Sequence, residues 1–169
     1  MNKFFSLILF VFMFSCDDGD LQIETLDFND ASLQTCGTVA IAQNNVLFKL
    51  NTNEALIMNL GPNTLKNEVG AFVIEITAST STQVSYRIFS DTATKNYFCD
   101  IVPPVSPTVV EEIIASQATI AVTTTNTGTA TEPIFSHQIE ITKITLQTAS
   151  GQRITDLTLN EFGTVTTTN

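Results

Sequence analysis

Residues 70–89 read GAFVIEITASTSTQVSYRIF, and two parts of this stretch alternate in polarity from one residue to the next. One parity carries Phe72, Ile74 and Ile76 in the first part, and Val84, Tyr86 and Ile88 in the second. Successive side chains of a β-strand point to opposite faces, so a period of two is typical of a strand with one buried face. The stretch therefore predicts two half-buried strands.

The same pattern continues along the chain in both directions. It predicts strands around residues 46–50, 56–60, 120–122, 139–146 and 154–159, with turns at Gly61-Pro62-Asn63 and Ser150-Gly151. Residues 109–116 are the one segment that could form one or two turns of helix.

The long strand has an irregular register. Ile139 and Ile141 share one parity, whereas Ile144 and Leu146 share the other. A bulge near Thr142-Lys143 would bring all four side chains to the core face, and we predict one there.

Short, regularly spaced strands with turn signals between them are typical of an all-β protein. The proline-rich segment 103–107 reads as a crossing loop between two strand-rich halves, each too small to fold alone. We predict a single two-sheet β-sandwich, Ig-like or jelly-roll, with little helix. The order of the strands does not follow from the sequence.

The N-terminus has the three parts of a signal peptide: Lys3, an apolar run from Phe4 to Phe14, and a small residue, Ser15, before Cys16. Eleven helical residues reach about 16 Å, roughly half of a bilayer core, so the run is too short to be a membrane anchor. We predict residues 1–15 to be a signal peptide.

Met13-Phe14-Ser15-Cys16 resembles a bacterial lipobox, with Met13 and Phe14 in place of the usual leucine and small residue. The resemblance implies that Cys16 is lipidated and becomes the first mature residue. The alternative is ordinary cleavage that leaves a free cysteine. Two or more acyl chains would anchor the protein stably in the membrane.

An acidic stretch follows, with Asp17, Asp18 and Asp20 next to Cys16. It is similar to the export signal of surface lipoproteins of Bacteroidota, which implies an outer-membrane location facing the cell exterior. In other bacteria, aspartate after the cysteine can mean retention at the inner membrane. The stretch also reads as a solvated tether. We predict a lipidated cysteine and acidic tether over 16–35 and the sandwich domain over 36–169.

The chain carries 17 acidic and 7 basic residues, a net charge of −10, and losing Lys3 makes the mature form more acidic. A chain of this charge, without a basic patch, is not expected to bind nucleic acid through its phosphates. The one partner that the sequence predicts is the membrane, which the protein would contact through the lipid anchor at Cys16. A protein or glycan partner stays open.

The chain has three cysteines, and lipidation of Cys16 leaves two. Outside the cytoplasm an even pair predicts a disulfide, here between Cys36 and Cys99. Two buried free thiols are the alternative.

Residues with catalytic potential are few. His137 is the one histidine, and neither a zinc site nor a Gly-x-Ser-x-Gly elbow accompanies it, so we expect it to face solvent. No pair of carboxylates stands out, and no phosphate-binding loop is present. We expect a protein that is not an enzyme and has no cofactor.

Binding features are equally sparse. There is no tryptophan, Tyr86 is expected in the core with its hydroxyl paired, and Tyr97 is expected to pack near the disulfide, which leaves little material for a glycan-binding platform.

Two further positions are weaker candidates for a site. Asp27, Asn29 and Asp30 are candidate cation ligands, although such residues more often cap turns. Asp91-Thr92-Ala93 resembles the O-glycosylation signal of Bacteroidota envelope proteins, which implies modification of Thr92.

The sequence as a whole predicts a lipid-anchored, non-catalytic binding or interaction module of the outer membrane, similar to the small surface lipoproteins of Flavobacteria-like bacteria. The alternatives are an accessory lipoprotein subunit of a larger outer-membrane complex and, less favoured, a glycan-binding module.

Overall fold

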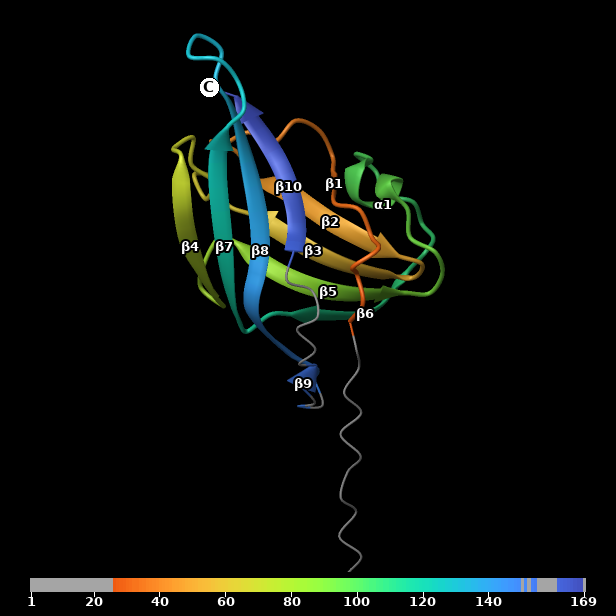
Figure 1. Cartoon of the computed structure of the whole chain (residues 1–169). Coiled ribbons are helices and arrows are strands. Elements are labelled where there is room, and N and C mark those ends of the chain that lie inside the picture. The colour runs from red at the N-terminus through yellow and green to blue at the C-terminus, as the bar shows by residue number, and fades with distance from the viewer. Residues whose placement is uncertain (1–25, 150, 152, 155–160, 169) are drawn as a thin grey trace, which may run out of the picture.

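The structure is a computed structural model that describes residues 26–149, 151, 153–154 and 161–168 (Figure 1). These described residues are almost entirely β, with one short helix. Its elements are, in order, β1 Gln34–Thr35, β2 Asn45–Asn51, β3 Glu54–Leu60, β4 Gly70–Thr77, β5 Gln83–Phe89, α1 Lys95–Cys99, β6 Val109–Ile114, β7 Gln117–Asn126, β8 Ile134–Gln147, β9 Arg153–Ile154 and β10 Glu161–Thr168.

The strands form two antiparallel sheets that face each other (Figure 1). Sheet A has the order β1-β2-β3-β5-β6, and sheet B has the order β10-β8-β7-β4, with β9 paired to the end of β8. The predicted two-sheet, all-β fold is confirmed. Each sheet has two edge strands: β1 and β6 in sheet A, and β4 and β10 in sheet B.

The core lies between the sheets, and the side chains that the alternating pattern predicted to be buried point into it. Ile76, Val84, Tyr86, Ile120 and Val122 are all buried there. The hydroxyl of Tyr86 donates a hydrogen bond of 2.8 Å to Glu54 Oε1, so its predicted pairing is confirmed.

The predicted bulge in β8 is also confirmed. Thr119 of β7 lies opposite Lys143 and Ile120 lies opposite Ile141, so Thr142 is the extra residue. Ile139, Ile141 and Leu146 are buried, and Ile144 packs against the same core.

A second, smaller core covers the outer face of sheet A. Phe48 and Phe89 of the sheet are buried against α1, where the rings of Phe98 and Phe48 stack with centroids 4.4 Å apart. Tyr97 meets Phe89 edge-on at 4.8 Å. The predicted disulfide Cys36–Cys99 is present and fastens the end of α1 to the residue after β1.

This second core explains why β2 departs from the expected alternation. Leu47, Phe48 and Lys49 are consecutive and all buried, because β2 has the main core on one face and α1 on the other. The helix at 95–99 was not predicted, because five residues carry no helical periodicity and α1 is held by its aromatic contacts and the disulfide.

Two expectations about the fold were wrong. Residues 109–114 form strand β6 rather than helix, because Ile113 pairs with Tyr86 of β5 and tertiary pairing overrides a weak helical pattern. The packed part of the chain also begins before the boundary predicted at residue 36, because Leu26 and Phe28 are buried in the main core.

Candidate functional site

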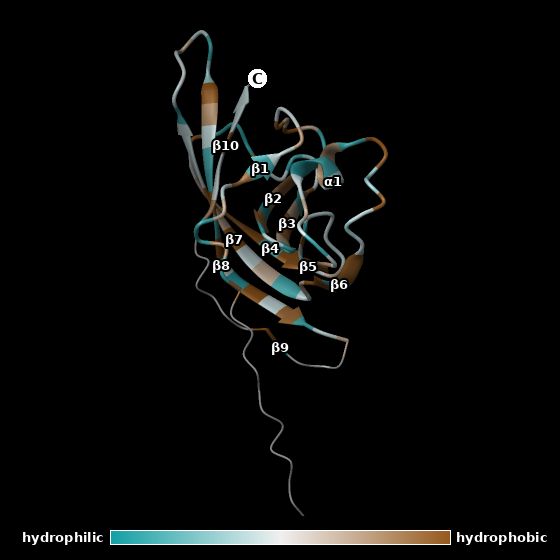
Figure 2. Cartoon of the chain, turned by 90° about the vertical axis from the view of Figure 1, so that its right-hand side faces the viewer, coloured by the Kyte–Doolittle hydropathy of each residue, from teal (hydrophilic) through white to brown (hydrophobic). Residues whose placement is uncertain are grey.

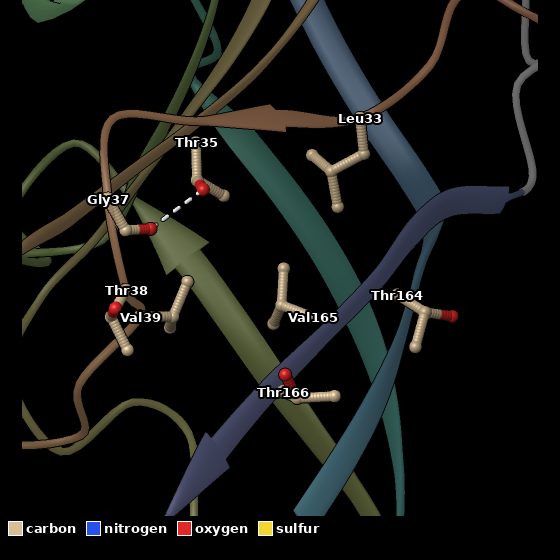
Figure 3. Close-up of a pocket in the computed structure, with 8 residues that line it drawn as sticks. All are labelled: Leu33, Thr35, Gly37, Thr38, Val39, Thr164, Val165 and Thr166. Atoms are coloured by element: carbon tan, nitrogen blue, oxygen red, sulfur yellow. Dashed lines mark hydrogen bonds between the residues drawn. The ribbon is translucent and has the colours of Figure 1, made fainter.

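In the described part of the chain, a concave feature lies between the two sheets, on the side where β1 and β10 form the edges. Here β1 has only two residues, and segment 36–44 continues as a loop instead of pairing with sheet B. We call the resulting depression the β10 groove (Figure 3). Its first part, about 550 Å³, is lined by Leu33, Thr35, Gly37, Thr38, Val39, Thr164, Val165 and Thr166.

The groove continues past the end of β10. A second part of about 710 Å³ shares Thr38 and Val39 with the first, and also includes Thr168 and residues of loops 40–42 and 63–68. Both volumes fall within the range of ordinary ligand sites, which runs from about 300 to 1,000 Å³.

The loop wall of the groove is held in place from several sides. The side chain of Asn45 accepts the N–H of Ala40 at 3.0 Å and donates to the Ala40 carbonyl at 2.8 Å. Asn63 N–H donates to the Ile41 carbonyl at 2.7 Å. The disulfide fixes Cys36, and the Thr35 hydroxyl donates to the Gly37 carbonyl at 2.8 Å, the bond drawn in Figure 3. The wall is therefore preorganised.

One end of the groove is closed at Gly163. Its φ of +141° is a conformation that other residues rarely adopt, and a Cβ placed there would lie 2.8 Å from Leu33 Cβ. Glycine thus allows Leu33 to cross close to β10, and beyond this crossing the two segments separate (Figure 3).

The direction of the main-chain groups on β10 follows from the neighbouring ladder. Thr127 N–H donates to the Ile134 carbonyl at 2.8 Å, so Ile134 turns its main-chain groups towards β7. Thr168 lies opposite Ile134 across the β8–β10 pair, so its own groups point away from β8. Because this direction alternates along a strand, Thr164 and Thr166 also point their N–H and C=O groups to the free edge.

The free edge ends at Thr168, whose carbonyl accepts a hydrogen bond of 3.3 Å from Asn67 Nδ2. In the part of the chain that the structure describes, no strand pairs with β10 on the side away from β8. Thr164 and Thr166 therefore present a main-chain edge to the groove.

The four edge strands differ in how they are protected. Native proteins shield sheet edges by making them short or by placing charged residues on them. The first strand, β1, has two residues, β4 carries Glu75, and β6 carries Glu111 and Glu112. Only β10 is long and without a charged residue from Phe162 to Thr168. Among the described edges, β10 is the one suited to pair with another strand.

His137 of β8 lies opposite the groove residue Val165 of β10, and here the prediction of a solvent-facing side chain was wrong. The ring is fully buried, with Nδ1 at 2.9 Å from Thr124 Oγ1 and Nε2 at 2.8 Å from Thr167 Oγ1. The sequence did hold the signal, because His137 has the parity of Ile139 and Ile141. Its polar partners come from β7 and β10, which only the fold brings together.

The hydrogen-bond pattern fixes the tautomer of His137. The one hydroxyl proton of Thr167 is donated to Asn67 Oδ1, so Thr167 Oγ1 accepts from His137 Nε2–H, and Nδ1 accepts from Thr124. Burial lowers the pKa of His137, which favours this neutral form. The chain of polar contacts connects β7, β8 and β10 to loop 63–68.

A buried lysine fixes the other end of β10. Lys49 Nζ donates to the carbonyls of Phe28 at 3.2 Å and Glu161 at 3.3 Å, connecting β2 of sheet A with the first residue of β10. Burial lowers the pKa of Lys49, and the nearby Glu161 carboxylate opposes that shift. The edge strand is thus anchored at both ends.

The other predicted site residues lie away from the groove. Cys16 is outside the described residues. Thr92 is exposed in the loop between β5 and α1. Asp27 and Asp30 line a small depression of about 230 Å³, and Asp27 Oδ1 accepts the Asn29 N–H at 3.1 Å, as in a turn cap. The described residues include no cluster of three histidine, cysteine or acidic side chains that could hold a metal ion.

Sequence reasoning also missed an exposed apolar segment between α1 and β6. Ile101, Val102 and Val105 are largely exposed, and Val110 of the following strand, β6, is 67% exposed. Figure 2 shows β6 and parts of the preceding loop in brown, the colour of apolar residues. Among the described residues, no helix has the length and apolar character needed to cross a bilayer.

No protein family, curated protein or solved structure matches the chain.

Proposed function

We propose that this chain is a lipid-anchored, non-catalytic binding or interaction module of the outer membrane, and that its partner binds in the β10 groove. The observation that carries the proposal is the free main-chain edge of Thr164 and Thr166 beside a preorganised, uncharged wall. Binding sites are commonly such preformed concave surfaces. Because the protein is already ordered there, little of the binding free energy is spent on ordering it.

The anchor follows from the signal peptide pattern and Cys16. Its test is the incorporation of labelled palmitate into the full chain and into the Cys16→Ala variant. We expect label only in the former. Protease added to intact cells should then digest the domain if it faces the exterior, with a periplasmic protein as the protected control. Protection until lysis would contradict the outward orientation.

The binding role of the groove is tested by photo-cross-linking in the native cells. A benzoylphenylalanine residue at position 166 should give a discrete adduct. The matched control carries the same residue at position 73, which is 68% exposed at the opposite edge of sheet B. Adducts that are absent at 166, or equally strong at both positions, would refute a binding site in the groove.

A second candidate function, an accessory subunit of a larger outer-membrane complex, is favoured by the exposed segment around Ile101, Val102 and Val105. Exposed apolar residues that gather in one segment are typical of protein–protein or membrane contacts. This role predicts stable co-purification with an integral membrane protein in mild detergent, lost when Ile101 and Val105 are both replaced by serine.

A further inference from the structure

We infer that the occupant of the β10 groove is an extended, uncharged polypeptide segment of a partner protein, which joins sheet B as an additional strand beside β10. The inference rests on the proposed binding role of the groove and goes further by naming the kind of ligand and how it is held.

The chemistry of the edge points to a strand. Thr164 and Thr166 each offer one N–H and one C=O in the direction of the groove, at the two-residue spacing of an antiparallel or parallel ladder. Donors and acceptors in this arrangement are matched by the main chain of another extended segment, which is the basis of recognition by strand addition.

The geometry sets the length of the segment. The available edge runs from Gly163, where Leu33 crosses, to Thr168, whose carbonyl is taken by Asn67. At about 3.3 Å per residue this edge spans roughly 16 Å, enough for about five paired residues. The two parts of the groove lie along this same length, since one includes Thr164–Thr166 and the other Thr168.

The walls select against charge. The eight residues that line the first part of the groove are all uncharged, and Val39 and Val165 are buried on its inner side. A charged side chain pressed against them would lose its hydration without finding a partner. Lys66 and Glu68 appear only in the second part, beyond Thr168. Uncharged, β-branched residues at the positions facing the wall suit this surface best.

The test uses a proline substitution that removes one edge donor. Because the Thr166 N–H points away from β8, Thr166→Pro leaves the β8–β10 ladder intact, and proline is tolerated at such edge positions. Val73→Pro is the matched control. The Val73 N–H also points away from the neighbouring strand. Thr77 N–H donates to Thr80 Oγ1, away from β7, and Val73 lies four residues earlier on β4, so its N–H has the same direction. Both variants and the wild type are prepared from residue 17 onward, which includes all of the described residues. Urea unfolding then verifies that each of them is folded.

A phage-displayed library of random seven-residue segments is then selected on the wild-type chain. We expect enriched segments that are uncharged and rich in β-branched residues. Their affinity should fall at least tenfold on Thr166→Pro and less than twofold on Val73→Pro. Thr166→Pro removes one main-chain donor and leaves the matching carbonyl of the bound segment unpaired, a loss that corresponds to about that factor. Two synthetic copies of the best segment are also compared, N-methylated at alternate residues in the two possible registers. The copy whose methylated groups face β10 should bind the wild type at least tenfold more weakly.

Three results would overturn the inference. The first is a library that yields no segment with a preference for the wild type over Thr166→Pro, and the second is a segment that tolerates N-methylation in both alternate registers. The third is a wild-type dimer that dissociates on Thr166→Pro in sedimentation, because a second copy would then be the occupant. If the cross-link at position 166 persists in any of these cases, the binding role of the groove stands and only strand addition fails.

Discussion

Removal of the disulfide should cost this protein much of its stability. The bridge joins Cys36 and Cys99, which are 63 positions apart in the chain. In the chain-entropy model, closing a loop of this length lowers the entropy of the unfolded chain by about 14 cal/mol/K, or about 4 kcal/mol at 25 °C. We expect the double variant Cys36→Ala/Cys99→Ala to lose about this much free energy of unfolding.

The structure indicates that the loss arises mainly in the unfolded state. Phe98 stacks on Phe48 and Tyr97 packs on Phe89, so α1 keeps contacts with sheet A when the bridge is absent. The folded double variant should therefore retain the far-ultraviolet circular dichroism spectrum of the wild type.

The assay is urea unfolding at 25 °C of the chain from residue 17 onward, followed by circular dichroism. The wild type in reductant should reproduce the double variant, and the slope of free energy against urea should rise in both because their unfolded chains are more expanded. A loss below 1 kcal/mol with an unchanged slope would refute the reasoning.

Three other features are tested by substitution. Burial lowers the pKa of His137 in the folded chain, so below pH 6.5 the unfolded chain binds a proton at His137 that the folded chain does not. The free energy of unfolding should therefore fall as the pH is lowered, by up to about 1.4 kcal/mol per pH unit. The His137→Asn variant should lack this part of the pH dependence in urea titrations at pH 7.5 and 5.5; an equal dependence would contradict it. Gly163→Ala should lose about 2–4 kcal/mol through its positive φ and its contact with Leu33, as measured by thermal unfolding. Leu33→Gly in the same chain removes both the Cβ and the Cδ2 atoms that the new methyl group meets, so the added cost of Gly163→Ala in that background should shrink to the positive-φ part. Thr52 has a φ of 49° in the β2–β3 turn, so Thr52→Asn should raise the free energy of unfolding by about 0.5–1 kcal/mol, and a decrease would argue against strain there.

Much of the candidate site was beyond the reach of sequence reasoning. Thr164 and Thr166 belong to a threonine-rich stretch that reads as any exposed strand. Their importance arises because β10 lies at an edge and β1 is too short to cover it. Gly163 likewise shows its role only when Leu33, from the other end of the chain, is found against it.

By itself, the sequence determined the all-β class, the core parity of most strands, a bulge near Thr142-Lys143 and the pairing of Cys36 with Cys99. These features follow from local alternation or from a count of cysteines, both of which are present in the chain before it folds.

Only the tertiary structure decided that residues 109–114 form a strand, that His137 is buried between Thr124 and Thr167, and that β10 has a free edge beside a groove. Each depends on which strands meet. Alternation sets the face that a side chain occupies, but the neighbour of a strand is chosen by packing among segments far apart in sequence.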